Sequence, residues 1–161
     1  MEKNKIKFSE FGNYGNVDWI KSAQRIDYQD SFDWMLSYVK KIQMGDAKEV
    51  IWLLEHEDIY TAGTSAKEND FKGLKNIKVL KTNRGGQWTW HGPGQRIVYF
   101  MMNLNNRKTD VRWYVNKLEQ LIIDTLEEFS ITAERREKSP GVWVKRKINS
   151  QERIDKIGAI G

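Results

Sequence analysis

The 161-residue sequence contains no cysteine, and this absence limits both its chemistry and its architecture. Without cysteine the chain can form neither disulfide bonds nor thiolate metal sites. Histidine is also scarce, because His56 and His91 are the only two and lie far apart in the sequence. Structural zinc sites need four nitrogen or sulfur ligands. We therefore expect no metal ion.

Long hydrophobic runs are missing as well. No stretch of eighteen or more apolar residues occurs, so we expect no membrane-spanning segment. The charged residues 1–5 are not followed by the apolar block of a signal peptide, and the cytoplasm is therefore the expected location. The net charge of +5 favours an acidic partner. Nucleic acid, an acidic carrier protein and an anionic membrane surface would all match that charge.

Apolar residues at helical spacing predict two helices. The first is expected from about Tyr28 to a stop at Gly45, with Asp30 or Ser31 as its cap. The second is expected over residues 111–129, with Thr109 or Asp110 as its cap.

Other segments show the composition of strands and loops. Strands are predicted over residues 6–11, 50–54, 77–82, 87–90, 96–104 and 142–144, with the second buried on both faces and the fifth running through the sheet interior. Glycine and asparagine predict a loop at 12–21. A basic cluster at 145–147 is interpreted as a solvated hairpin tip. Because helices and strands do not alternate regularly, the predicted fold class is α+β in a single domain.

Residues 83–95 form the most informative stretch, Asn-Arg-Gly-Gly-Gln-Trp-Thr-Trp-His-Gly-Pro-Gly-Gln. It holds four of the twelve glycines and one of the two prolines, which is unusually dense turn chemistry for thirteen residues. Gly85 and Gly86 allow positive φ and close approach of the backbone to a ligand. The Gly-Pro-Gly sequence at 92–94 fixes a second turn. The residues alone leave two interpretations, a hairpin with glycine corners or a ligand-binding loop.

Three segments of the sequence resemble the octanoyltransferases, the lipoyl(octanoyl) transferases that begin lipoate assembly. That family usually carries Arg-Gly-Gly-Gln-x-Thr-Tyr-His-Gly-Pro-Gly-Gln, and residues 84–95 differ at Trp90, where tyrosine is common. Residues 56–63 resemble its His-Pro-x-x-Tyr/Phe-Thr-x-Gly segment, with Glu57 in place of proline. Residues 140–144 and 156–161 resemble its Pro-Gly-Val-Tyr/Trp-Val and Lys-Ile-Ala-x-x-Gly segments.

The resemblance implies a fold and a site. The fold is the mixed β-sheet flanked by helices of the biotin and lipoate-protein ligases, with an acyl tunnel between the central motif and the strand of Lys156. It makes Lys156 the catalytic lysine, whereas the sequence alone would make it an ordinary surface lysine. The implied substrate-binding residues are Arg84, Gly85, Gly86, Gln87, Trp88, Thr89, Trp90, His91, Ala159, Ile160 and Gly161. Among them Trp88 or Trp90 would wall the acyl chain, and His91 would orient the thioester or the thiol.

The resemblance also implies a reaction without a cofactor. An octanoyl group passes from octanoyl-acyl carrier protein, through an acyl-cysteine, to a lysine on a lipoyl domain of a 2-oxoacid dehydrogenase or of the glycine cleavage H protein. A lysine ammonium near the thiol stabilises the reactive thiolate. The family's cysteine follows in a Pro-x-Cys-Gly segment beyond the lysine, but this sequence ends at Gly161. We expect residues 1–161 to be a C-terminally incomplete catalytic domain that does not form the acyl-enzyme by itself.

Three alternatives stay open. An ATP-dependent lipoate-protein ligase shares the fold and needs no cysteine, but that family typically carries Arg-x-Ser-Gly-Gly-Gly-Ala-Val-Tyr-His-Asp instead of the motif found here. A nucleic-acid-binding module would suit the basic charge, although the tryptophans do not form a stacking platform between lysines. A catalytically inactive homologue is the third possibility.

Overall fold

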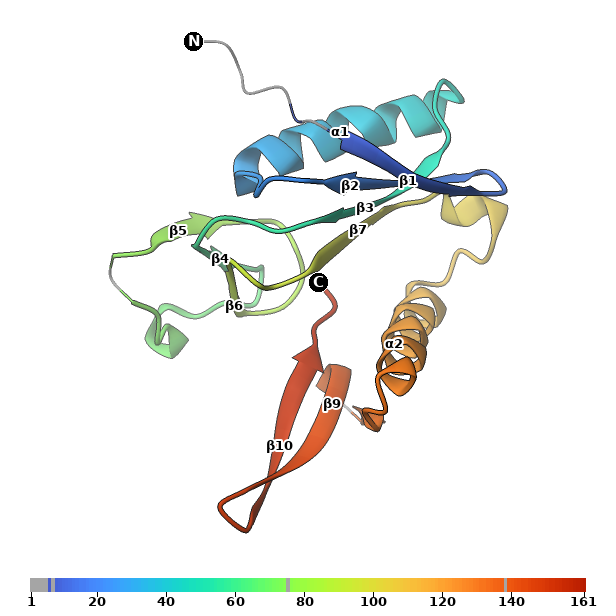
Figure 1. Ribbon diagram of the computed structural model, residues 1–161. Helices are drawn as coiled ribbons and strands as arrows, with labels where there is room; N and C mark the ends of the chain where they lie inside the picture. The colour runs from blue at the N-terminus through green and yellow to red at the C-terminus, as the bar shows by residue number, and fades with distance from the viewer. Residues whose placement is uncertain (1–5, 7, 75, 138) are drawn as a thin grey trace. The chain divides into compact units, whose positions relative to one another are not determined.

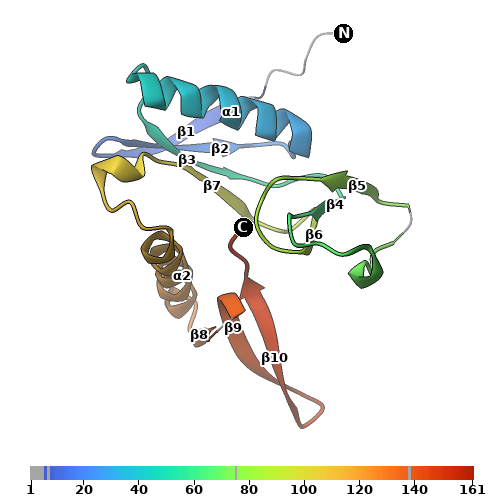
Figure 2. The same ribbon diagram turned by 180° about the vertical axis from the view of Figure 1, so that it is seen from behind.

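The computed structural model describes residue 6 and residues 8–74, 76–137 and 139–161. These residues belong to two compact units, the first ending at Asn103 and the second beginning at Leu104. Figures 1 and 2 together label the α-helices and the strands of both units. The expectation of a single domain stays a prediction.

The first unit contains a four-stranded mixed sheet in the order β1-β2-β3-β7. Its strands are β1 (Phe8–Tyr14), β2 (Val17–Ser22), β3 (Glu49–Leu54) and β7 (Ile97–Met101). The pairs β1–β2 and β3–β7 are antiparallel, whereas β2–β3 is parallel. The predicted buried strand at 50–54 is confirmed as β3.

Helix α1 (Tyr28–Met44) covers one face of this sheet, as Figures 1 and 2 both show. Asp27 caps the helix, because its carboxylate accepts the backbone N–H groups of Gln29 and Asp30, so the predicted cap at Asp30 or Ser31 was wrong by one turn. It ends at Gly45 as predicted, in the left-handed conformation. Its partly buried side chains pack on the fully buried core of β3, with Trp34, Met35, Tyr38, Val39 and Ile42 contributed by the helix and Trp52 and Leu54 by the strand.

A second, three-stranded sheet of this unit has the order β5-β4-β6. It consists of β4 (Ile59–Ala62), β5 (Lys78–Lys81) and β6 (Trp88–His91), with a short 3-10 helix, η1 (Glu68–Asp70), between β4 and β5. Strand β6 pairs antiparallel with β4, and β5 pairs parallel with β4 from the other side. The glycine-rich motif therefore does not close a hairpin with the strand before it, and its glycines shape a connection that carries the chain across β4.

Two predictions for this unit were wrong. Residues 12–21 are not a loop, because β1 and β2 form a hairpin around a turn at Gly15 and Asn16. The glycine at position 12 is accommodated by a register shift between Glu10 and Gly12, a β-bulge that lets a strand carry a residue typical of loops. Residues 96–104 do not run through the sheet interior, because β7 is an edge strand that ends at Met101.

The second unit contains the 3-10 helix η2 (Leu104–Asn106), helix α2 (Val111–Glu128) and an antiparallel sheet in the order β10-β9-β8. Asp110 caps α2 by accepting the N–H of Trp113, which confirms one of the two predicted caps. Strand β8 (Ala133–Arg136) was not predicted, whereas the strand after Pro140 is confirmed within β9 (Ser139–Ile148), which pairs with β10 (Gln151–Gly158).

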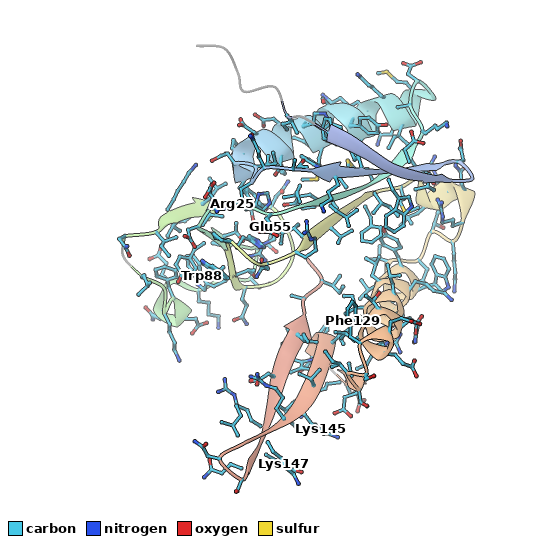
Figure 3. The ribbon with its side chains drawn as sticks, in the orientation of Figure 1. Arg25, Glu55, Trp88, Phe129, Lys145 and Lys147 are labelled. Carbon is cyan, nitrogen blue, oxygen red and sulfur yellow. The ribbon has the colours of Figure 1, made fainter. Side chains whose placement is uncertain are left out.

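The basic cluster of this unit is exposed, as predicted, although it lies on the arm of β9 and the tip itself is Asn149 and Ser150. Figure 3 labels Lys145 and Lys147 on this arm. With mixed sheets and two long helices, the predicted α+β class is confirmed. Among the described residues, no helix is both long and apolar enough to cross a bilayer.

Candidate functional site

The glycine-rich motif is fastened to the loop that follows β4 by backbone hydrogen bonds. Gly63 donates its N–H to the carbonyl oxygen of Gln87 over 3.1 Å, and Ser65 donates to that of Gly86 over 3.1 Å. The two loops are so close that a Cβ atom on Gly63 would lie 2.3 Å from the carbonyl oxygen of Gly86. Position 63 therefore requires glycine for this close approach.

Arg84, the first residue of the predicted site, joins the motif loop to β4 through hydrogen bonds of its guanidinium group. Its Nε and Nη2 atoms donate to the hydroxyl of Thr61 over 3.1 and 2.8 Å, and Nη2 also reaches the carbonyl oxygen of Thr61 at 2.8 Å. The carbonyl oxygens of Gly85 and Gln87 each accept from the guanidinium over 2.8 Å. All three guanidinium nitrogens thus bond to protein oxygens, and the side chain fixes the shape of the loop.

His91 lies at the end of β6 with both ring nitrogens near polar partners. Its Nδ1 atom is 2.7 Å from Oε1 of Gln95, whose amide nitrogen donates to the carbonyl oxygen of Trp90 over 3.1 Å. Since that amide oxygen faces the ring, the network assigns the proton to Nδ1 and leaves Nε2 as an acceptor. The hydroxyl of Thr61, 3.5 Å from Nε2, already accepts from Arg84 and so has its proton free for His91.

A second histidine, His56, is fully buried, and its ring centroid lies 5.8 Å from that of His91. Its Nδ1 atom donates to the carbonyl oxygen of Ile26 over 2.7 Å, and its Nε2 atom accepts from the hydroxyl of Tyr99 over 2.8 Å. Burial lowers the pKa of His56. Burial also lowers the pKa of His91, partly offset by the bond to Gln95 and reinforced by the charge of Arg84. Both rings are therefore neutral at pH 7.

Aromatic rings surround the two histidines. The ring of Tyr28 stacks on that of His91 with 5.9 Å between centroids and 18° between planes, and it lies 5.2 Å from that of His56. Burial raises the pKa of Tyr28 and of Tyr99, so both phenols keep their protons. The side chains packed around His91 are therefore neutral rings, with the Arg84 guanidinium acting on His91 and the Asp27 carboxylate acting on His56 as nearby charges.

The two tryptophans of the motif lie on the opposite face of β6, because side chains alternate along a strand. Trp88 donates its indole N–H to the carbonyl oxygen of Lys67 over 2.7 Å and packs its ring 4.5 Å from that of Phe71. Trp90 donates to Asp58 over 3.0 Å. That Trp88 or Trp90 walls an acyl chain stays a prediction, and neither shares the face of Thr89 and His91.

The remaining predicted residues belong to the second unit. Lys156 is an exposed residue of β10, and its Nζ atom donates to the carbonyl oxygen of Pro140 over 2.9 Å. The same atom lies 4.8 Å from the centroid of the Trp143 ring, a cation–π distance. Beyond the buried Gly158, Ala159 and Gly161 are exposed and Ile160 is half-buried. The acyl tunnel expected between the motif and Lys156 stays a prediction.

A polar hollow of about 640 Å³ in the first unit does not contain the predicted site. Its charged side chains are largely paired with one another, because Arg25 contacts Glu57 at 2.9 Å and Arg96 contacts Glu55 at 3.4 Å. Figure 3 labels Arg25 and Glu55. In the described part of the chain, no group of three or more histidine, aspartate or glutamate side chains is placed to hold a metal ion.

Sequence reasoning missed several residues that build this site. Gln95 and Thr61 lie within the segments that resemble the octanoyltransferases, so the sequence could have marked them as site residues. It could not have shown that Gln95 binds His91 or that Thr61 binds Arg84. Tyr28 and Tyr99 carried no signal, since each looked like a core position of a helix or strand.

Comparison with known proteins gives a consistent result. The model of a family described as lipoyl protein ligase A/B catalytic domain matches residues 27–161. A protein of Bradyrhizobium sp. named octanoyltransferase is 46% identical over 93% of this chain and 62% of its own length. Octanoyltransferases of Parvibaculum lavamentivorans and Dinoroseobacter shibae are each 47% identical, over 89% and 90% of this chain and 64% and 68% of their own lengths. The chain thus spans somewhat under two thirds of the first two relatives.

Proposed function

The chain belongs to the lipoyl protein ligase A/B catalytic domain family, and we propose that it forms the acyl-binding part of an octanoyltransferase. The observation that carries this proposal is the motif loop, which is fastened to the loop after β4 and held from inside by Arg84. A rigid glycine-rich backbone beside a neutral imidazole suits the binding of an uncharged acyl thioester. Agreement with octanoyltransferases over about nine tenths of the chain supports the same assignment.

The proposed reaction moves an octanoyl group from a thioester to an amine. The donor is octanoyl-acyl carrier protein, and the acceptor is the ε-amino group of a lysine on a lipoyl domain of a 2-oxoacid dehydrogenase or of the glycine cleavage H protein. The carbon–sulfur bond of the thioester breaks, a carbon–nitrogen amide bond forms, and the amine proton passes to the departing sulfur. The thioester is already activated, so the transfer needs no ATP and no cofactor.

In this proposal the motif binds the acyl thioester. Gly85 has open space beside its α-carbon, so the substrate can approach the backbone there. His91, held neutral with its proton on Nδ1, presents Nε2 as an acceptor for a thiol or amine proton, which would replace the long contact of 3.5 Å with the Thr61 hydroxyl. Arg84 acts on the substrate indirectly, through the shape of the loop.

Lys156 is proposed as the catalytic lysine. Its ammonium group stabilises a thiolate and can give a proton to the departing sulfur, and the lysine, then neutral, can accept the proton of the attacking amine. The acyl-enzyme step requires a cysteine, and these 161 residues contain none. We therefore expect the chain alone to bind the acyl group without transferring it.

The net charge of +5 suits acidic protein partners, and the cytoplasm is the proposed location. Nucleic acid and membranes are not proposed as partners.

Binding of octanoyl-pantetheine to the ¹⁵N-labelled chain tests the acyl-binding proposal. We expect dose-dependent shifts of the amide signals of Gly85, Gly86 and Gln87, and of residues 159–161. Free pantetheine, which lacks the octanoyl group, is the matched control and should bind at least tenfold more weakly, because burial of each methylene contributes about 0.8 kcal/mol. Shifts confined to the hollow lined by Arg25 and Glu55 would contradict the proposal.

The absence of cysteine also favours a second candidate, the ATP-dependent lipoate-protein ligase. The family description covers both ligase A and ligase B proteins. Lipoate-dependent consumption of ATP by the chain would favour the ligase, and its absence in a titration that shows octanoyl-pantetheine binding would favour the transferase.

A further inference from the structure

A buried carboxylate on α2 lies close to Lys156 without belonging to the predicted site. Glu119 is only 4% exposed. Its Oε1 atom accepts the backbone N–H of Gly141 over 2.7 Å, and its Oε2 atom accepts from Nε of Arg135 over 3.2 Å. Arg135 also donates to the carbonyl oxygen of Asn116 over 2.9 Å. Each carboxylate oxygen therefore has a partner, and the buried charge is compensated.

The peptide group that Glu119 holds is the one that Lys156 contacts. The N–H of Gly141 and the carbonyl oxygen of Pro140 belong to the same peptide group, and the described chain contains no cis peptide bond. In a trans peptide the N–H and C=O point in opposite directions. Glu119 therefore binds one side of this group, while Nζ of Lys156 donates to the other side over 2.9 Å. Hydrogen bonds arranged in such a chain strengthen one another.

The corner at Gly141 also fixes the path of the lysine stem. Gly141 has a φ of 114°, and a Cβ atom there would lie 3.3 Å from Cδ and Cε of Lys156 and 2.6 Å from the carbonyl oxygen of Gly158. The bare α-carbon thus leaves room for the stem to pass. Beyond this corner, the ammonium group at the end of the Lys156 side chain lies 4.8 Å from the Trp143 ring centroid.

We propose that Glu119 is a positioning residue for Lys156, because it fixes the Pro140–Gly141 peptide to which the ammonium group is bound. The inference rests on the proposed function only in treating Lys156 as the catalytic lysine. An exposed lysine would otherwise spread over many rotamers, and ordering it costs side-chain entropy. By holding the Pro140–Gly141 peptide in place, the buried carboxylate keeps the carbonyl oxygen that binds the ammonium group in a fixed position.

The Glu119→Gln variant of the whole chain tests this inference by NMR with ¹³C-labelled lysine. Glutamine keeps the size of the side chain but offers one acceptor oxygen, so its NH₂ group must face a donor of either Gly141 or Arg135. We expect the Gly141 amide proton to move upfield. We also expect the ε-methylene protons of Lys156 to lose the ring-current shift from Trp143 and approach those of an exposed helical lysine such as Lys40.

Glu134→Gln is the matched control. Glu134 is a carboxylate of the same unit that pairs with Lys145 at 3.1 Å and lies opposite Trp143 in the register of β8 and β9, so its loss changes the charge beside the same ring without removing the Glu119 hydrogen bonds. It should leave the Lys156 signals in place. If Glu119→Gln moves the Gly141 amide and leaves the Lys156 signals unchanged, the inference is overturned.

A second variant covers the case in which Glu119→Gln does not fold. Glu119→Asp keeps the charge for Arg135 but shortens the reach to Gly141 by one carbon–carbon bond. It should move the same Lys156 signals in the same direction, and their constancy would overturn the inference equally.

Adding octanoyl-pantetheine to the unmodified chain separates the two proposals. If the ligand leaves the Lys156 signals unmoved, the proposal that Lys156 lies beside the bound acyl thioester fails, while the Glu119→Gln result still decides whether the carboxylate positions the lysine.

Discussion

The buried histidine at position 56 makes stability depend on pH. Its pKa in the folded chain lies below the ordinary value of 6.5 because burial disfavours the charged ring. Below pH 6.5 His56 binds more protons in the unfolded chain than in the folded chain. Its contribution to the free energy of unfolding is therefore largest above pH 6.5 and decreases as the pH falls towards the pKa of the folded chain. The free energy of unfolding, measured with urea, should decrease as the pH is lowered from 7.5 to 5. His56 should contribute at most about 1.4 kcal/mol per pH unit to this decrease.

The His56→Gln variant is the control for this decline. Glutamine can donate to Ile26 and accept from Tyr99, but it does not titrate. The free energy of unfolding of this variant should change less steeply with pH than that of the unmodified chain, and the remaining slope should include the contribution of His91. Equal slopes would show that His56 is not the titrating group.

The guanidinium of Arg84 cannot be replaced by another cation. Lysine would offer one nitrogen in place of a fork that contacts Thr61, Gly85 and Gln87, so several of these oxygens would lose their donor. We expect Arg84→Lys to lower the free energy of unfolding by roughly 1–3 kcal/mol. Amide hydrogen exchange at Gly63 and Ser65, measured beside urea unfolding, should accelerate.

Arg25→Lys is the comparison for this substitution. Arg25 makes one exposed ion pair with Glu57, and its replacement should change stability by less than about 1 kcal/mol. If Arg84→Lys is as mild as Arg25→Lys, the guanidinium does not hold the loop.

At the scale of elements, the joint between the motif and the loop after β4 depends on one missing side chain. Gly63→Ala would place a Cβ atom 2.3 Å from the carbonyl oxygen of Gly86, so the two loops must separate. The expected loss of stability is about 1–3 kcal/mol, typical of overpacking, together with weaker octanoyl-pantetheine binding. Gly85→Ala is the matched change, because its Cβ atom would meet no atom within 4 Å. It should leave stability almost unaltered, and equal losses in the two variants would refute the tight joint.

The spacing of apolar residues allowed the helices to be predicted. The features that the sequence did not predict depend on contacts between segments that are distant in the chain. The stripe of Met35, Val39 and Ile42 could only suit a helix, and α1 is confirmed. Strand β8 is too polar to show alternation and exists through its pairing with β9. The residues of the motif were identified from the sequence, but the contact of Tyr28 with His91 arises only when segments more than sixty positions apart meet in the fold.

At the scale of the whole molecule, the proposed acyl binding and the proposed acyl transfer can be tested separately, because these 161 residues contain no thiol. The groups proposed to bind the acyl chain are present, but the thiol that would carry it is not. Lys156, on β10 of the second unit, can therefore be tested in its catalytic role only when a thiol is supplied. A chimera in which residues 1–161 are followed by the C-terminal part of an octanoyltransferase that carries a Pro-x-Cys-Gly segment would supply it.

We expect the 161-residue chain alone to leave a lipoyl domain unmodified when mixed with octanoyl-acyl carrier protein, and the chimera to octanoylate it. Lys156→Ala in the chimera should lower the rate by about 100-fold or more, because an acid–base group of the reaction is lost. Lys40→Ala, which removes an exposed charge on α1, should leave the rate unchanged. Intact-protein mass spectrometry of the lipoyl domain measures each rate. Transfer by the unextended chain at the rate of the chimera would mean that no cysteine is needed, and an active Lys156→Ala chimera would remove this lysine from the mechanism.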